Sequence, residues 1–155
     1  MRVTIAIALI GTWTLRSFTD ISGDGPPRNP FGLRPEGLLI YTPDGFVSAL
    51  LMTPGRPPLG GAGSTDGTPD QFKEAGSGFI GYSGRYEVDE MKSIVRHTPL
   101  VAFSSDMVGK SQQRLVELNG DVLILTAEHA QPVSPVVAKS QLEWVRVKDI
   151  RPEGN

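Results

Sequence analysis

A histidine within an apolar stretch is the residue of this sequence whose type is best suited to chemistry. His97 lies in the middle of Ile94–Thr98, and the two-residue period of a strand puts it on the same face as Val95. If that face lines a buried interior, His97 is available to donate a proton, to accept one or to anchor a ligand. The structural alternatives are a hydrogen bond to a neighbouring strand or a side chain that faces solvent.

Arg114 is the second candidate for a catalytic role. Val116 and Leu118 share its face of the predicted strand, while Leu115 and Glu117 occupy the other face. An inward Arg114 requires a carboxylate, a carbonyl or a ligand beside it, because an unpaired buried charge is costly. On the outer face it would be an ordinary solvated cation, and the sequence leaves both placements open.

Three tyrosines and a methionine are candidates for the wall of a ligand site. Tyr41, Tyr82 and Tyr86 each combine an aromatic surface with a hydroxyl, and Met52 offers an adaptable apolar surface. Aromatic walls with a few converging polar groups are the usual composition of a pocket. We therefore predict that these four side chains bind a ligand, with core packing as the alternative role of each.

Chemistry that needs thiols, metals or nucleotide loops finds no support in the sequence. There are no cysteines, and the two histidines, His97 and His129, lack the spacing of metal ligands. Gly76, Gly78 and Gly81 match a dinucleotide-binding pattern, but they neither follow a strand nor open a helix. We therefore expect neither a metal nor a cofactor.

The elements that must position these residues are short strands. Runs rich in β-branched and aromatic residues recur between turn signals, which is typical of a sandwich or a barrel. Pro43-Asp44-Gly45 and Asn119-Gly120-Asp121 join neighbouring runs as tight hairpins, because glycine supplies the positive φ that such turns need. We predict an all-β fold, a single antiparallel up-and-down β-barrel of about 8–10 strands with one or two short helices. The predicted strands are Trp13–Ile21, Gly37–Thr42, Phe46–Thr53, Arg85–Asp89, Ser93–Phe103, Gln112–Leu118, Val122–Ala127 and Leu142–Lys148.

The intervening segments contain one predicted helix and two long loops. Thr68 or Asp70 is expected to cap a helix over residues 71–75, with Pro69 in its first turn. Residues 55–67 are rich in Gly, Pro and Ser and are expected to form a flexible loop. A second such loop covers residues 23–35. Both are expected at the ends of the barrel, where loops control access to the interior.

Length and charge limit the classes of partner. The 155 residues fit one domain spanning 1–155, and a net charge of −2 gives no electrostatic reason to expect nucleic acid or an anionic membrane. The apolar run Val3–Ile10 is too short for a membrane span and lacks the features of a cleavable leader. We therefore expect a cytoplasmic protein whose residues 1–10 form a helical turn or strand that plugs the floor of the barrel.

Several segments, taken in order, resemble one family. Gly11-Thr12-Trp13 is similar to the Gly-x-Trp signature of lipocalins, and the resemblance extends from Ile10 to about Val147. The segments that carry it are Gly37–Ala49, Tyr82–Tyr86, Val95–His97, Gln113-Arg114, Asn119–Leu125 and the final Trp144-Val145-Arg146. Together they resemble the compact lipocalin-like domains of bacteria and fungi, many of which are encoded within natural-product biosynthetic clusters.

The resemblance implies a barrel that binds a hydrophobic small molecule, with Trp13 closing its floor and Arg146 packed across that ring. It also implies two functions, between which no motif decides. The first is a cofactor-independent cyclase or isomerase of a polyketide- or terpenoid-like intermediate, in which His97 and Arg114 would be catalytic. The alternative is a non-catalytic carrier of a hydrophobic metabolite. Trp144 is predicted to lie outside the barrel near the floor, and a homodimer is compatible with the sequence without being required by it.

Overall fold

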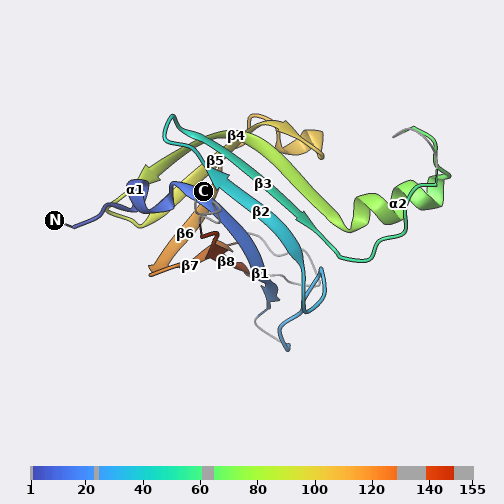
Figure 1. Cartoon of the computed structure of the whole chain (residues 1–155), viewed down its shortest axis with the longest axis horizontal. Helices are drawn as coiled ribbons and strands as arrows, with labels where there is room; N and C mark the ends of the chain where they lie inside the picture. Colours follow the sequence, from blue (N-terminus) through green and yellow to red (C-terminus); the bar gives the residue numbers. More distant parts are fainter. Residues whose placement is uncertain (1, 23–24, 61–64, 129–138, 149–155) are drawn as a thin grey trace, which may run out of the picture.

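The protein is a closed antiparallel barrel in which each strand pairs with its neighbour in sequence and β8 closes on β1 (Figure 1). The computed structural model describes residues 2–22, 25–60, 65–128 and 139–148. The architecture confirms the predicted all-β, up-and-down barrel. Its strands are β1 (Gly11–Ile21), β2 (Glu36–Tyr41), β3 (Phe46–Met52), β4 (Phe79–Asp89), β5 (Ile94–Ala102), β6 (Gln112–Asn119), β7 (Val122–Glu128) and β8 (Lys139–Arg146).

Strand β4 begins six residues earlier than the sequence indicated, at Phe79 instead of Arg85. One glycine of the added segment is required by packing inside the sheet. Gly84 lies at an irregularity in the β4–β5 pairing, where a Cβ atom would come within 2.1 Å of the carbonyl oxygen of Thr98. A glycine within a strand commonly marks such a close approach between backbones. Strand β8 is also displaced and spans Lys139–Arg146 instead of Leu142–Lys148.

Within the described residues, two short α-helices accompany the barrel, α1 (Ile5–Leu9) and α2 (Pro69–Ser77), together with a 3-10 turn η1 (Ser105–Met107). Thr68 and Gln71 form a reciprocal capping box at the start of α2, so Thr68 is the cap of the two residues predicted, and the helix is longer than the predicted 71–75. No residue of α2 is buried, and the helix projects from the strands on the side away from α1 (Figure 1). Neither described helix is long and apolar enough to cross a membrane.

Alternation along the strands divides the barrel into an inner and an outer face. In β2 and β3 the inner residues Leu39, Ala49 and Leu51 are buried, whereas Leu38 and Leu50 on the outer face remain 45% and 44% exposed. Segment 53–68 connects β3 with α2 and includes the predicted loop 55–67, of which residues 61–64 lie outside the described residues. In the 22–35 connection, Phe31 is buried against Phe18 of β1 with an edge-to-face ring contact.

Candidate functional site

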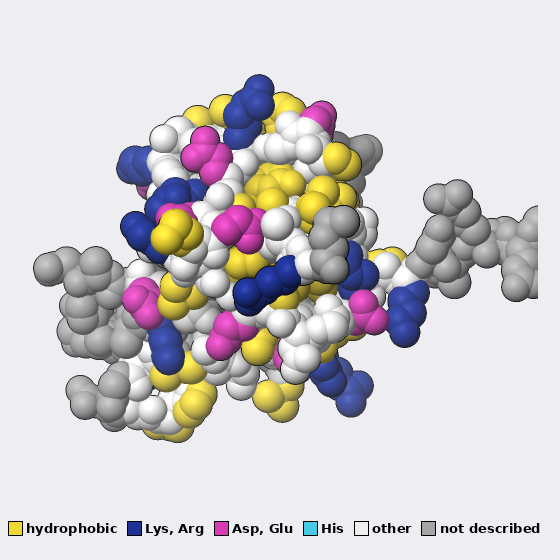
Figure 2. Space-filling model, turned by 90° about the vertical axis from the view of Figure 1, so that its left-hand side faces the viewer, with side chains coloured by type: hydrophobic (Ala, Val, Ile, Leu, Met, Phe, Trp, Pro, Cys, Tyr) yellow, Lys and Arg dark blue, Asp and Glu magenta, His cyan; other side chains and the backbone are white. Residues whose placement is uncertain are grey.

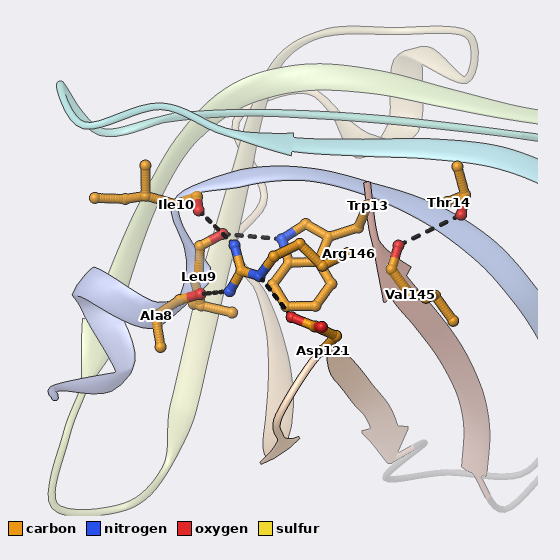
Figure 3. Close-up of polar contacts among 8 residues, drawn as sticks. All are labelled: Ala8, Leu9, Ile10, Trp13, Thr14, Asp121, Val145 and Arg146. Atoms are coloured by element: carbon orange, nitrogen blue, oxygen red, sulfur yellow. Dashed lines mark hydrogen bonds and ion pairs between the residues drawn. The ribbon is translucent and has the colours of Figure 1, made fainter. Parts of the chain in front are cut away.

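One end of the barrel is closed by a tryptophan, a short helix and an arginine. Trp13 is fully buried at the start of β1, and its indole N–H donates a hydrogen bond of 3.0 Å to the carbonyl of Leu9 at the end of α1. The guanidinium of Arg146, at the end of β8, lies 4.2 Å from the centre of the Trp13 ring (Figure 3). A cation over an aromatic face is attracted by the ring quadrupole. Helix α1 therefore belongs to the floor of the barrel.

Arg146 also ties the chain together at this floor. It donates hydrogen bonds of 2.6 Å to the carbonyl of Ala8 and 3.0 Å to that of Ile10, and its Nε lies 3.6 Å from a carboxylate oxygen of Asp121 (Figure 3). These carbonyls lie at the C-terminal end of α1, where no following helical N–H is available to donate to them. The arginine therefore satisfies acceptors that would otherwise be orphaned. One side chain thus joins α1, β8 and the β6–β7 turn.

Above the floor, the barrel encloses a cavity of about 430 Å³. This volume lies within the range of small-molecule sites. Most of the lining is aliphatic or aromatic, and the polar side chains are contributed by β1, β4, β5, β6 and β8. The lining residues are Phe18, Asp20, Leu39, Ala49, Leu51, Ile80, Tyr82, His97, Met107, Gln112, Arg114, Leu125, Ala127, Ser140, Leu142 and Trp144.

His97 is buried on the inner face of β5 and lies between two tyrosine hydroxyls. The hydroxyl oxygen of Tyr41 is 2.7 Å from Nε2, and that of Tyr82 is 2.6 Å from Nδ1. Both ring nitrogens are therefore engaged, and the imidazole is 1% exposed. Tyr82 lines the cavity with His97, whereas Tyr41 lies behind them, outside the cavity lining. The three side chains form a continuous polar chain from the cavity into the core.

Burial keeps all three members of this chain uncharged near neutral pH. Desolvation, reinforced by the nearby Arg114 cation, lowers the pKa of His97 to about 3. Burial raises the pKa of Tyr41 well above its ordinary value and also raises that of Tyr82, although Arg114 opposes both shifts. The chain therefore consists of a neutral imidazole and two protonated phenols.

Arg114 projects from β6 into the cavity lining, on the same face as the buried Val116. Its guanidinium donates to the side-chain oxygen of Gln112 at 2.8 Å and to the backbone carbonyl of Gln113 at 3.0 Å. Among the described residues it has no carboxylate partner within ion-pair distance. Neutral oxygens thus satisfy some of its N–H groups without forming an ion pair.

Comparison with known families identifies the family to which this barrel belongs. The model of the lipocalin-like domain matches residues 10–147, which includes all eight strands and the Trp13–Arg146 floor. The chain belongs to the lipocalin-like domain family. The 4'-hydroxy-3'-methoxypropiophenone carrier protein ppsC of Aspergillus oryzae is 32% identical to it over 104 residues, which cover 63% of this chain and 94% of that relative.

The position of Trp144 in this lipocalin-like barrel corrects the sequence analysis. Trp144 was expected outside the barrel, yet it is 1% exposed and lines the cavity. The two-residue period places it on the same face as Arg146, which reaches across the inner ring of Trp13 at the barrel end. That shared face is therefore the inner one. The Trp144 indole N–H is buried without a hydrogen-bond partner among the described residues.

Two further predicted ligand residues lie away from the cavity lining. Tyr86 packs edge-to-face on Tyr41, and its hydroxyl donates to the carbonyl of Thr42 at 2.8 Å. Met52 borders a separate hollow of about 440 Å³, against the outward-facing Leu38 and Leu50. Met52 was chosen for its type alone, and the two-residue period of β3 places it on the outer face with Leu50 and not on the inner face with Leu51. Their roles in ligand binding stay predictions.

Among the residues that the structure describes, the surface and the remaining polar groups supply no second centre of comparable chemistry. Figure 2 shows basic and acidic side chains interspersed over the face that it presents, with no histidine visible there. Within the described ranges, His, Asp and Glu form no group of three that could hold a metal ion. His129 lies outside the described residues. The cavity is therefore the candidate functional site.

Proposed function

We propose that this lipocalin-like protein is a non-catalytic carrier that encloses a hydrophobic aromatic metabolite in its barrel. The observation that carries the proposal is the cavity of about 430 Å³, whose lining is mainly apolar and which lies beside a neutral, internally hydrogen-bonded Tyr41–His97–Tyr82 chain. Burial of apolar ligand surface supplies roughly 25 cal/mol per Å², and a few polar groups then orient the ligand.

The state of His97 favours carriage over the cyclase or isomerase reaction that headed the sequence-based hypotheses. A general base is most effective when its pKa lies near the working pH. The pKa of His97 is lowered to about 3 by burial and then by Arg114, and both of its nitrogens are already hydrogen-bonded. The imidazole is therefore a weak base, and its geometry suits a structural and orienting role.

The relative from Aspergillus oryzae supports the same choice and suggests a ligand class. It is named as a carrier of 4'-hydroxy-3'-methoxypropiophenone, an aromatic ketone. Carried over to this chain, that name supports a single-ring aromatic ligand with oxygen substituents. Such a molecule is small enough for the cavity and has both an apolar body and polar groups.

Displacement of a fluorescent hydrophobic probe tests the proposal. The purified protein is loaded with 1-aminoanthracene and titrated with propiophenone and with 4'-hydroxy-3'-methoxypropiophenone, and each ketone is recovered after long incubation for mass spectrometry. We expect one probe molecule per chain, displacement by the ketones, and recovery of both ketones chemically unchanged. Absence of probe binding would refute a ligand-binding barrel, and a converted ketone would refute the non-catalytic role.

A matched pair of variants locates the binding site. Ala127 lines the cavity, whereas its neighbour Glu128 is exposed on the opposite face of β7. Ala127→Phe is expected to fill part of the cavity and weaken probe binding, while Glu128→Phe adds the same ring outside and leaves binding unchanged. Circular dichroism of both variants checks that the barrel is intact. Equal loss of binding in the two variants would place the probe outside the barrel.

A further inference from the structure

The buried hydrogen-bond chain has a direction that its surroundings determine. Within the part of the chain that the structure describes, the Tyr41 hydroxyl has one hydrogen-bond partner, Nε2 of His97. If His97 carried its proton on Nε2, it would donate to Tyr41, and the Tyr41 O–H would be a buried donor with no acceptor. An unsatisfied buried donor is unfavourable by roughly 1–3 kcal/mol. Tyr41 therefore donates to Nε2, and the neutral imidazole carries its proton on Nδ1.

This direction determines what the cavity offers to a ligand. With the proton on Nδ1, His97 donates to the hydroxyl oxygen of Tyr82, 2.6 Å away. The Tyr82 O–H is then free of the imidazole, and Tyr82 lines the cavity. The polar chain thus ends in a hydrogen-bond donor on the cavity side. A neutral histidine has one donor and one acceptor nitrogen, so the direction of the first bond determines the second.

Other polar groups of the lining reinforce this donor character. The N–H of Trp144 is buried and unpartnered, and the Arg114 cation has no carboxylate partner among the described residues. The lining acceptors are already engaged in part: the side-chain oxygen of Gln112 accepts from Arg114, and one oxygen of Asp20 accepts from Ser140 at 2.6 Å. A buried donor without a partner is satisfied by a ligand oxygen that accepts its hydrogen bond.

We propose that the cavity selects ligands that combine an aromatic body with a hydrogen-bond acceptor oxygen, namely aromatic ketones. The Tyr82 O–H donates a hydrogen bond to the carbonyl oxygen of such a ligand. The inference rests on the proposed ligand-binding function and specifies which chemistry the site recognises. Tyr41 and His97 are positioning residues in this arrangement, because they act on the ligand through Tyr82. The Arg114 cation, which has no ion-pair partner among the described residues, adds a potential that favours the negative end of a carbonyl dipole.

The experiment compares two probes that differ in one group, butyrophenone and butylbenzene, in which a carbonyl replaces a methylene. Because water solvates the ketone better than the hydrocarbon, the informative quantity is the change in each affinity between variants and not the difference between ligands. Tyr82→Phe removes the proposed donor. Ser83→Ala is the matched control, since Ser83 is the neighbour of Tyr82 on the opposite face of β4, its hydroxyl donates to that of Ser48 at 2.8 Å, and it is absent from the cavity lining. Calorimetry or displacement of 1-aminoanthracene reports the dissociation constants.

We expect Tyr82→Phe to weaken butyrophenone binding about tenfold, the contribution of one hydrogen bond, without weakening butylbenzene binding. Ser83→Ala should leave both affinities unchanged. A Tyr82→Phe variant that shifts the two affinities equally would overturn the inference and leave the proposed carrier function standing. If neither compound binds the wild-type protein and 1-aminoanthracene does not bind either, the proposed function itself fails.

The tautomer of His97 gives a second readout that needs no variant at Tyr82. Nitrogen-15 NMR of the labelled wild-type protein distinguishes a protonated from an unprotonated ring nitrogen, and His97→Gln assigns the signals against those of His129. The inference requires the proton on Nδ1. A proton on Nε2 would reverse the chain, direct the Tyr82 O–H to the imidazole and overturn the proposal.

Discussion

Arg146→Ala removes the side chain that closes the barrel floor. The substitution deletes two charged hydrogen bonds, to the carbonyls of Ala8 and Ile10, and the packing of the guanidinium over Trp13. It also deletes the contact with Asp121, whose side chain is 53% exposed. Because α1 has only five residues, it cannot persist on its own propensity and depends on such tertiary contacts.

The magnitude follows from these contacts. Each hydrogen bond from a charged donor contributes roughly 1.5–3 kcal/mol, and the cation–aromatic contact contributes about 1 kcal/mol. The Arg146 side chain is 29% exposed, so water compensates part of this loss and we take the lower values. The free energy of unfolding should therefore fall by about 3–4 kcal/mol. For a chain of 155 residues this corresponds to a decrease in Tm of about 10 °C.

Thermal and urea unfolding of purified variants measures this effect. Arg16→Ala is the matched control, because Arg16 is also on the barrel but is 60% exposed and forms a single ion pair within the described residues, with Glu143 at 3.8 Å. A surface ion pair of this kind contributes less than about 0.5 kcal/mol. Arg146→Lys should fall between the two, since a lysine retains the cation but lacks the planar fork that reaches two carbonyls. If Arg146→Ala lowers the Tm no more than Arg16→Ala does, the floor is held by other contacts and the reasoning is wrong.

Three further predictions concern other parts of the barrel. Since the pKa of His97 falls from 6.5 to about 3 on folding, only the unfolded chain is protonated between these values, and stability declines as the pH drops. Between about pH 7 and about pH 5 this contributes a loss of about 2 kcal/mol, which urea titrations should find in the wild type and not in His97→Gln. Glu90→Ala removes the carboxylate that accepts hydrogen bonds of 2.9 and 2.8 Å from two backbone amides of α1. Calorimetry should show that the free energy of unfolding falls by about 1 kcal/mol. An unchanged Tm would mean that water replaces the carboxylate as the acceptor. Gly84→Ala would place a methyl group 2.1 Å from the Thr98 carbonyl oxygen, and we expect a loss of more than about 3 kcal/mol; a wild-type urea midpoint would show that the two backbones can separate.

The fold could be derived from the sequence because its signals are local. The hairpin at Gly45 has a φ of +92° and that at Gly120 a φ of +61°, as their turn sequences indicated. Thr68 caps α2 because its hydroxyl oxygen accepts a hydrogen bond from the Gln71 amide, a contact between residues three positions apart. The Gly-x-Trp pattern at Trp13 and the distant Arg146 were linked by family resemblance, since 133 residues separate them.

The site depended on contacts between residues far apart in the sequence. His97 could be placed on a strand face with Val95, but its partners lie 56 residues away at Tyr41 and 15 residues away at Tyr82. Residue type alone gave Tyr82 and Met52 equal standing as ligand residues, and the fold places only the first of these two at the interior cavity. Sequence alternation states which residues share a face and leaves open which face is enclosed.

Trp144 shows why that choice requires the closed barrel. The sequence shows that Trp144 and Arg146 are two positions apart and therefore share a face of the strand. The same pattern is expected for an inner and for an outer face. Closure of β8 on β1 pairs Trp144 with Leu15 and brings Arg146 opposite Trp13, which turns the shared face inward. The sequence by itself thus determined strands, turns and the family. The tertiary structure decided which polar groups meet in the cavity, because burial and strand register are properties of the assembled barrel.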